Sequence, residues 1–182
     1  DSSNSTIKEF SYNDKLPWPV AADTLGYSIV LRAPGQNLDP SEPTHWRASV
    51  TPGGTPGSSD GTLLAGNPTD DLDGDGLTAL LEHALGTSDN DATQSGSASA
   101  SRMLIDGILY DSFTYTVKEV ADDVRTLVET TIDLQNWSND PAELVELVVT
   151  SNGDGTVTRT VRLATPAVVD SRRFFRVKAE LR

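Results

Sequence analysis

Four carboxylate residues in one short segment, Asp71, Asp73, Asp75 and Glu82, have types and spacing suited to binding a metal ion. Together with Gly76 they match the pattern D-x-[DN]-x-[DN]-G-x5-E, which is typical of the calcium-binding loop of EF-hands. In such a loop alternate residues direct their side chains at one centre, and the glycine permits a sharp turn. The glutamate, in the helix that follows, grips the ion with both carboxylate oxygens. The sequence therefore predicts a calcium site within residues 71–82.

The predicted ligand set also includes a backbone oxygen, the carbonyl of Leu77, at the seventh position of the loop. Ala79 has no side-chain oxygen, so a water molecule is expected where a side chain often holds one. Oxygen ligands, four of them charged, favour Ca²⁺ over Zn²⁺ or Cu²⁺. We expect a structural site of modest affinity, because no second complete loop exists to form the paired hand of a sensor. Asp89 and Asp91, which follow the helix, could complete a second, shared site.

The charge distribution supports a cation in this region. The chain carries a formal charge of -13, and residues 48–101 contain eight acidic residues and no Lys or Arg. Crowded carboxylates repel one another unless a cation lies between them. The alternative is a solvated acidic turn that caps the following helix, because acidic groups are favourable near a helix N-terminus.

One helix is predicted, over residues 77–85, because Leu77, Leu80, Leu81 and Leu85 form a single apolar stripe at helical spacing. Gly86 then stands where a helix C-cap is expected. Flexible segments are predicted on both sides of the loop and helix, a Gly/Pro/Ser-rich one over residues 51–61 and a Ser/Asp/Ala-rich one over residues 87–101.

The rest of the chain is predicted to form strands. In the first part, residues 7–12 and 27–31 are rich in β-branched and aromatic residues. In the last part, alternating apolar residues predict strands over 112–117, 125–134, 144–149, 157–163 and 173–177. Residues 150–156 carry a hairpin signature, which makes the neighbouring strands antiparallel. The fold class predicted is mainly β, with immunoglobulin-like β-sandwich modules joined by a short calcium-binding loop and helix.

We divide the chain into three parts on this basis: a partial β module over residues 1–58, a linker with the calcium loop and helix over 59–100, and a β-sandwich over 101–182. The first residue is Asp1 and not Met. We therefore expect a processed or excised piece of a longer protein.

Several functional classes are disfavoured. The absence of Cys excludes disulfides and thiol chemistry, and neither of the two His residues accompanies a recognisable nucleophile, so we expect no catalysis. The acidic balance argues against nucleic acid as a partner. No apolar run approaches the length of a membrane helix, so membrane insertion is not expected.

Residues 71–87 resemble the single calcium loop and helix of bacterial surface proteins, and are similar to dockerin halves and bacterial thrombospondin type 3 repeats. Residues 10–57, with Trp18-Pro19, Ala22 to Leu31 and Trp46-Arg47, resemble the C-terminal half of a bacterial lamin-tail domain, an immunoglobulin-like sandwich of extracellular proteins. Residues 115–117, 133–137 and 172–176 resemble a β-sandwich that ends large exported proteins of Verrucomicrobia and Planctomycetes. These resemblances imply a secreted or cell-surface bacterial protein.

The predicted function is that of a non-catalytic, calcium-stabilised structural or adhesion module. Its expected partners are other domains of the parent protein or neighbouring subunits, and calcium would order a hinge between the β modules. A first alternative is a carbohydrate-binding appendage of an extracellular enzyme, in which Trp18, Trp46 and Trp137 offer flat rings to a glycan. A solvent-facing coplanar pair of rings would favour that alternative. A second is a subunit of a self-assembling surface structure, because an incomplete sandwich invites completion by a neighbour.

Overall fold

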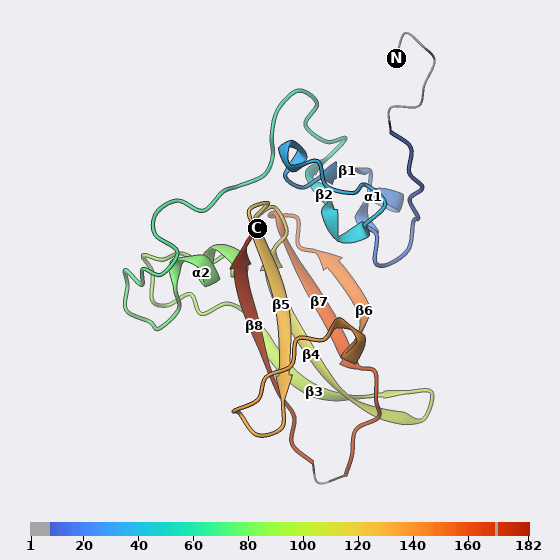
Figure 1. Cartoon of the computed structure of the whole chain (residues 1–182), viewed down its shortest axis with the longest axis vertical. Helices are drawn as coiled ribbons and strands as arrows, with labels where there is room; N and C mark the ends of the chain where they lie inside the picture. The colour runs from blue at the N-terminus through green and yellow to red at the C-terminus, as the bar shows by residue number, and fades with distance from the viewer. Residues whose placement is uncertain (1–7, 170) are drawn as a thin grey trace. The chain divides into compact units, whose positions relative to one another are not determined.

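The computed structural model describes residues 8–169 and 171–182, which divide into two compact units, one ending at Ser59 and the other beginning at Asp60. The units are described separately below, and Figure 1 traces the elements of both. Most of the regular structure is antiparallel β-sheet, so the prediction of a mainly β chain is confirmed. None of the helices in the described residues has the length and apolar character needed to cross a bilayer.

The first unit is built on a two-stranded antiparallel sheet of β1 (Tyr27–Leu31) and β2 (Trp46–Pro52). Short helical turns accompany it: α1 (Ala21–Thr24), η1 (Pro34–Gln36) and η2 (Pro43–His45). The strand predicted over 27–31 is confirmed, whereas β2 was not predicted. The strand predicted over 7–12 is wrong for residues 8–12, and Ile7 lies outside the described residues.

Aromatic packing explains that difference in the first unit. Phe10 stacks on Trp46 with ring centroids 5.1 Å apart, and Tyr12 meets Trp18 edge-on at 6.2 Å. The segment that looks like a strand by composition is therefore held by its rings against the indoles, without pairing of its backbone.

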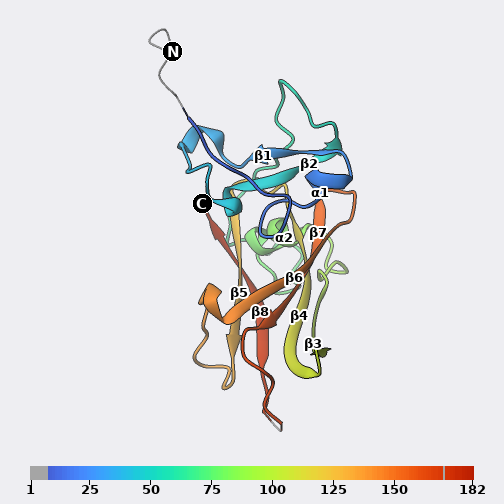
Figure 2. The ribbon, with the colours of Figure 1, turned by 90° about the vertical axis from the view of Figure 1, so that its right-hand side faces the viewer.

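The second unit contains six strands in two antiparallel sheets. One sheet has the order β3-β4-β7-β6 and the other consists of β5 and β8. The strands are β3 (Ala98–Ile105), β4 (Ile108–Lys118), β5 (Val124–Thr131), β6 (Leu144–Ser151), β7 (Thr156–Leu163) and β8 (Phe174–Leu181), with a short turn of helix, η3 (Pro141–Glu143), before β6. Figure 2 shows β5 and β8 on one side of this unit and β3 and β4 on the other.

The main core lies between these two sheets. Its buried members are Phe113, Tyr115 and Val117 from β4, Val128 from β5, and Val157 and Val161 from β7. The predicted alternation of residues 112–117 therefore marks the buried face correctly. The sheets face each other across this core as in a β-sandwich, and the β6–β7 hairpin has the antiparallel register expected for residues 150–156.

One linker prediction and one strand prediction for the second unit are wrong in part. The segment 87–101 was predicted to be a flexible linker, yet Ala98 to Ser101 form the start of β3, because pairing with β4 uses the backbone and needs no large side chains. The strand predicted over 125–134 ends at Thr131, and Ile132 and Leu134 are 66% and 56% exposed. Asp133 terminates it, since its carboxylate accepts the backbone N–H groups of residues 135 and 136 at 2.9 and 2.8 Å.

Helix α2 (Ala79–Leu85) is part of the second unit, where it packs against β4, β5 and β8. Leu85 contacts the main core, and Leu80 contacts a smaller cluster of Ala84, Ala121 and Val124. The predicted leucine stripe is thus directed at the sandwich, although the fully buried apolar residues of α2 are Ala79 and Ala84. The helix begins two residues later than predicted, after the N-cap Thr78.

Candidate metal centre

The three aspartates of the acidic loop lie together in the structure. Asp71, Asp73 and Asp75 each offer a carboxylate oxygen, and these oxygens lie within 4.8 Å of one another. The loop that carries them passes through Gly74 and Gly76, which have φ angles of 77° and 93°. Only glycine adopts such angles without strain, so the two glycines allow the tight winding that brings alternate residues to one side.

Backbone amides of the loop hold these carboxylates in place. Asp71 accepts hydrogen bonds from the N–H groups of Gly74 and Gly76 at 2.8 and 3.1 Å. Asp75 accepts from Leu77 at 2.7 Å, and Asp73 accepts from Asp75 at 3.2 Å. Each aspartate of the triplet is therefore fixed by at least one amide, and their negative charges are held side by side.

The buried Oδ2 of Asp73 has no hydrogen-bond partner, in contrast to its Oδ1 atom. A carboxylate oxygen that is removed from water and receives no hydrogen bond is energetically unfavourable, and its cost falls when a cation contacts it. This atom is the first of two buried carboxylate oxygens, in the loop and helix, that have no hydrogen-bond partner and that a cation would stabilise.

The second such atom belongs to Glu82 on α2. The residue is only 1% exposed; its Oε1 accepts a hydrogen bond from the Thr87 hydroxyl at 3.2 Å, while its buried Oε2 has no partner. Burial raises the pKa of the Glu82 carboxyl, and the neighbouring charges of Asp73 and Asp89 raise it further. A buried glutamate close to two other carboxylates is expected to bind either a proton or a metal cation.

Glu82 is positioned by both ends of its short helix. The Thr78 hydroxyl accepts the N–H of Leu81 at 3.4 Å, which caps the first turn. At the other end the carbonyl of Glu82 accepts the N–H groups of Gly86 and Thr87 at 2.8 and 3.0 Å. Gly86, with a φ of 81°, is the predicted C-cap.

Asp89 also reaches the loop. Its Oδ1 accepts the N–H of Leu72 at 3.0 Å, and its proximity contributes to raising the pKa of the Glu82 carboxyl. Asp91 is directed elsewhere, because Thr93 and Gln94 donate hydrogen bonds to its two oxygens at 2.6 and 2.9 Å. Of the two residues considered for a shared site, only Asp89 lies at the acidic loop.

These residues fit a calcium ion chemically. Asp71, Asp73 and Asp75 form the cluster of anionic oxygen atoms, and Glu82 is not a member of that cluster. One buried oxygen of Asp73 and one of Glu82 are without hydrogen-bond partners. The backbone carbonyl of Leu77 would complete the predicted set. Hard oxygen donors in a flexible loop suit Ca²⁺, whereas nitrogen or sulfur donors would be needed to favour Zn²⁺ or Cu²⁺.

Two hydrogen-bonding residues around the helix were not predicted from the sequence. Thr87, whose hydroxyl donates to Glu82, follows the C-cap residue Gly86. A threonine after a capping glycine does not by itself predict a hydrogen bond to a helix side chain. Asp123, from the segment before β5, contacts Nε2 of His83 at 3.1 Å and accepts the N–H of Leu64 at 2.7 Å. This contact holds the His83 side chain against Asp123, and His83 is not among the residues clustered at the acidic loop.

Trp18 and Trp46 are neighbours in the first unit, Trp137 belongs to the second unit, and all three are partly or wholly covered. Trp18 is 8% exposed, and its ring is tilted by 40° from that of Trp46, 6.5 Å away. The Trp46 Nε1–H donates to the carbonyl of Pro40 at 2.9 Å. The guanidinium of Arg176 lies over the Trp137 ring, 4.1 Å from its centroid. Among the described residues, no two indoles form the exposed coplanar platform that the carbohydrate alternative requires.

No family model, curated protein or solved structure matched this chain in the three comparisons.

Proposed function

We propose that the chain is a calcium-stabilised, non-catalytic structural or adhesion module of a secreted or cell-surface bacterial protein. Calcium would be bound by the side chains of Asp71, Asp73, Asp75 and Glu82 and by the carbonyl of Leu77. The observation that carries the proposal is the buried Oε2 of Glu82, which has no hydrogen-bond partner although it lies near other carboxylates.

The structural role follows from where the ligands are attached. Three of them belong to the loop, while Glu82 belongs to α2, whose Leu80 and Leu85 pack against the sandwich. An ion that joins loop and helix would fix residues 60–78 to a rigid element. The immunoglobulin-like character of the β modules and the extracellular location are supported by the resemblances of the sequence to lamin-tail domains and exported proteins.

The test is a calorimetric titration of the whole chain with Ca²⁺, paired with limited proteolysis. The wild type should bind calcium with a dissociation constant of roughly 10⁻⁴ to 10⁻³ M, and Asp73→Asn should lose binding. Cleavage within residues 60–100 should be slower in calcium than in chelator for the wild type alone. Absence of binding heat together with equal cleavage in both buffers would mean that the loop binds no calcium and serves only as an acidic cap of helix α2.

A matched control is provided by Asp133→Asn. Asp133, like Asp73, is an aspartate that accepts backbone N–H groups in a turn, but it lies after β5 and is not part of the acidic loop. Its substitution removes the same charge without altering the proposed ligand set. Calcium binding should therefore be unchanged in this variant, and a comparable loss would mean that the effect of Asp73→Asn is one of net charge.

A further inference from the structure

Strand β3 is an edge strand, and its outer side pairs with no other strand in the described residues. It forms one end of the order β3-β4-β7-β6, and all of its residues except Met103 and Ile105 are exposed. An exposed edge presents a row of N–H and C=O groups to which another strand can add. The backbone of β3 is therefore available for pairing on this side.

The backbone groups at the free edge belong to alternate residues of β3. The N–H of Thr116 donates to the carbonyl of Ser97, just before β3, at 2.9 Å. In an antiparallel ladder every second residue bonds to a given neighbouring strand, so the odd-numbered residues of β3 bond to β4. The residues whose N–H and C=O groups face the free edge are therefore Ala98, Ala100, Arg102 and Leu104.

The other sheet edges of the second unit are protected against strand addition. At the far end of the same sheet, β6 has a register shift between Glu146 and Val148, and in the facing sheet β5 and β8 each carry several charged side chains. Bulges and charges are common means of protecting an edge. By contrast, β3 pairs with β4 without a shift, and its single charged side chain, Arg102, is already held by Asp111 and by the Ser171 carbonyl, both at 2.9 Å.

The side chains of β3 are ordered so that the strand fits a second copy of itself. Residues 98–101 are all Ala or Ser, whereas residues 102–105 are Arg, Met, Leu and Ile. If two copies align antiparallel with Ser101 opposite Ser101, the small half of each strand lies opposite the large half of the other. Ala98 then faces Leu104, and small residues opposite large ones fill space without a clash.

Charge and backbone pairing agree with the same register. Arg102 of each copy faces Ala100 of the other, so no like charges stand directly opposite one another, an arrangement that would destabilise the sheet. Each residue with outward backbone groups also faces another such residue, as hydrogen bonding between the strands requires.

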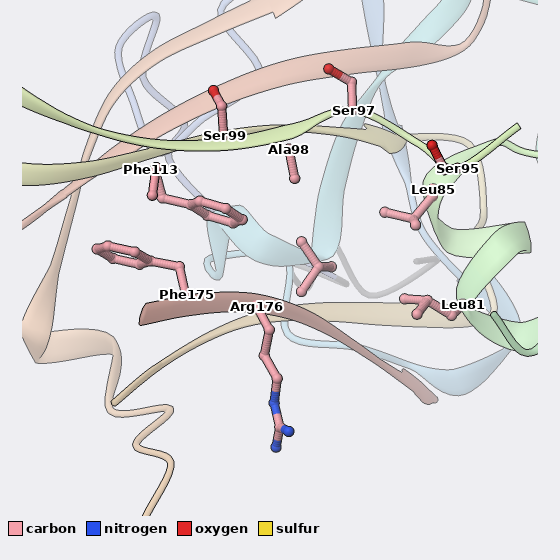
Figure 3. A pocket seen from close by; sticks show the side chains of 11 residues that line it. Leu81, Leu85, Ser95, Ser97, Ala98, Ser99, Phe113, Phe175 and Arg176 are labelled. Carbon is pink, nitrogen blue, oxygen red and sulfur yellow. The ribbon is translucent and has the colours of Figure 1, made fainter. Parts of the chain in front are cut away.

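The structure leaves Leu104 uncovered. It is 70% exposed, although strand alternation places it on the same side of the sheet as Ala98. Ala98 lines a groove of about 340 Å³ bordered by β3 and β8 on the open side of the sandwich, and Figure 3 shows its side chain directed into the groove, opposite in direction to Ser97 and Ser99. In the antiparallel register, Leu104 of the second copy would lie beside Ala98 at the rim of this groove.

We propose that β3 pairs with β3 of a second copy of this chain, antiparallel and about a two-fold axis at Ser101, so that the two four-stranded sheets become one continuous sheet across a dimer. Backbone hydrogen bonds would supply affinity, as in other complexes formed by strand addition, and the fit of small to large side chains would select the register. Because both copies use the same edge, the assembly closes at two chains. The proposal does not depend on calcium binding.

The first measurement is the mass of the whole chain in solution, by sedimentation velocity from about 5 to about 500 µM. The mass should rise with concentration from that of the 19.4 kDa monomer to twice that value and no further. A monomer at every concentration would overturn the proposal. Growth beyond the dimer would also overturn it, since the proposed contact closes.

A single cysteine tests the register, because the chain contains no Cys. Opposite residues of a non-hydrogen-bonded antiparallel pair have Cα atoms about 4.5 Å apart, which a disulfide can bridge. Ser101→Cys should therefore give a disulfide-linked dimer on mild oxidation. Ser99→Cys is the matched control, also an exposed serine of β3; its two copies would lie about 13 Å apart along the strands, too far to bridge. Equal cross-linking of the two variants would overturn the proposal.

A charge at position 100 gives a second test. Ala100→Glu places a carboxylate opposite Arg102 of the second copy and should lower the dissociation constant of the dimer at least about threefold, whereas Ala100→Lys places a like charge there and should raise it at least about threefold. Net charge acts in the opposite direction, because Lys reduces the formal charge of -13 and Glu increases it. A tighter dimer for Ala100→Lys than for Ala100→Glu would therefore overturn the proposed pairing.

Discussion

Replacing Glu82 by Gln separates the two consequences of burying a carboxylate next to the acidic loop: the cost of an unpaired oxygen and the proposed binding of calcium. Gln is nearly isosteric with Glu but carries no charge, and its amide can donate a hydrogen bond to the nearby Asp89. In the wild type without calcium, the buried Oε2 has no partner. An unsatisfied buried oxygen costs about 1–2 kcal/mol, so the variant should be at least as stable as the wild type in chelator.

In calcium the order should reverse. With a dissociation constant of roughly 10⁻⁴ to 10⁻³ M, about 10 mM calcium stabilises the wild type by about 1.4–2.7 kcal/mol. For a unit of this size that corresponds to a rise in Tm of about 5–10 °C. The variant lacks the carboxylate that we propose as a bidentate ligand, so calcium should shift its Tm by much less.

The assay is thermal unfolding of both proteins, followed by circular dichroism, in calcium and in chelator. Glu129→Gln is the control, because Glu129 is also buried but is paired with Arg176 at 2.6 Å. Its replacement should lower Tm equally in both buffers. If Glu82→Gln lowers Tm by the same amount with and without calcium, or keeps the full calcium shift, Glu82 is not a ligand and the reasoning from its unpaired oxygen is wrong.

Three further predictions concern single residues of the second unit. Asp89→Asn should weaken calcium binding in a calorimetric titration by about tenfold, because Asp89 reaches the acidic loop and adds negative charge near Glu82. Asp91→Asn should have little effect, and equal effects of the two substitutions would show that only net charge matters. Burial raises the pKa of Tyr115 to about 12 from 10.0, so the folded state disfavours its ionised form. Above pH 10 the free energy of unfolding of the wild type should therefore fall, relative to that of Tyr115→Phe, by about 1.4 kcal/mol per pH unit until the pH reaches the pKa of Tyr115 in the folded state. If urea titrations gave the same pH dependence of the unfolding free energy for both proteins, this prediction would be wrong. Gly86→Ala should destabilise the chain more than Gly107→Ala, because both have positive φ but only at Gly86 would the new Cβ meet another side chain, at 3.0 Å. Urea unfolding of the two variants isolates that contact, since the strain of about 1–2 kcal/mol from the positive φ is common to both.

Local patterns made much of this protein predictable. The acidic loop and helix α2 follow from residues within 16 positions of one another, because glycines at fixed places and an apolar stripe act over short distances. The β6–β7 hairpin is similarly local, with its turn chemistry between two alternating strands. In these segments the sequence predicts both the element and the face that is buried.

Other elements depend on partners that are distant in the sequence. Strand β3 is rich in Ser and Ala and has no hydrophobic alternation at its start; it is a strand because β4 pairs with it. Residues 8–12 have strand-like composition but pack through their rings against tryptophans. Both errors arise because backbone pairing and ring stacking between distant segments override local propensity.

By itself, the sequence determined the mainly β class, the acidic loop and the identity of its three clustered aspartates, because each depends on residue type and short-range spacing. Only the tertiary structure decided that Glu82 is buried with one oxygen unpaired, that Asp89 and not Asp91 reaches the loop, and that the sandwich is open between β3 and β8. Burial and the order of strands arise when segments far apart in the chain pack together. These properties therefore have no signature in the spacing of residues along it.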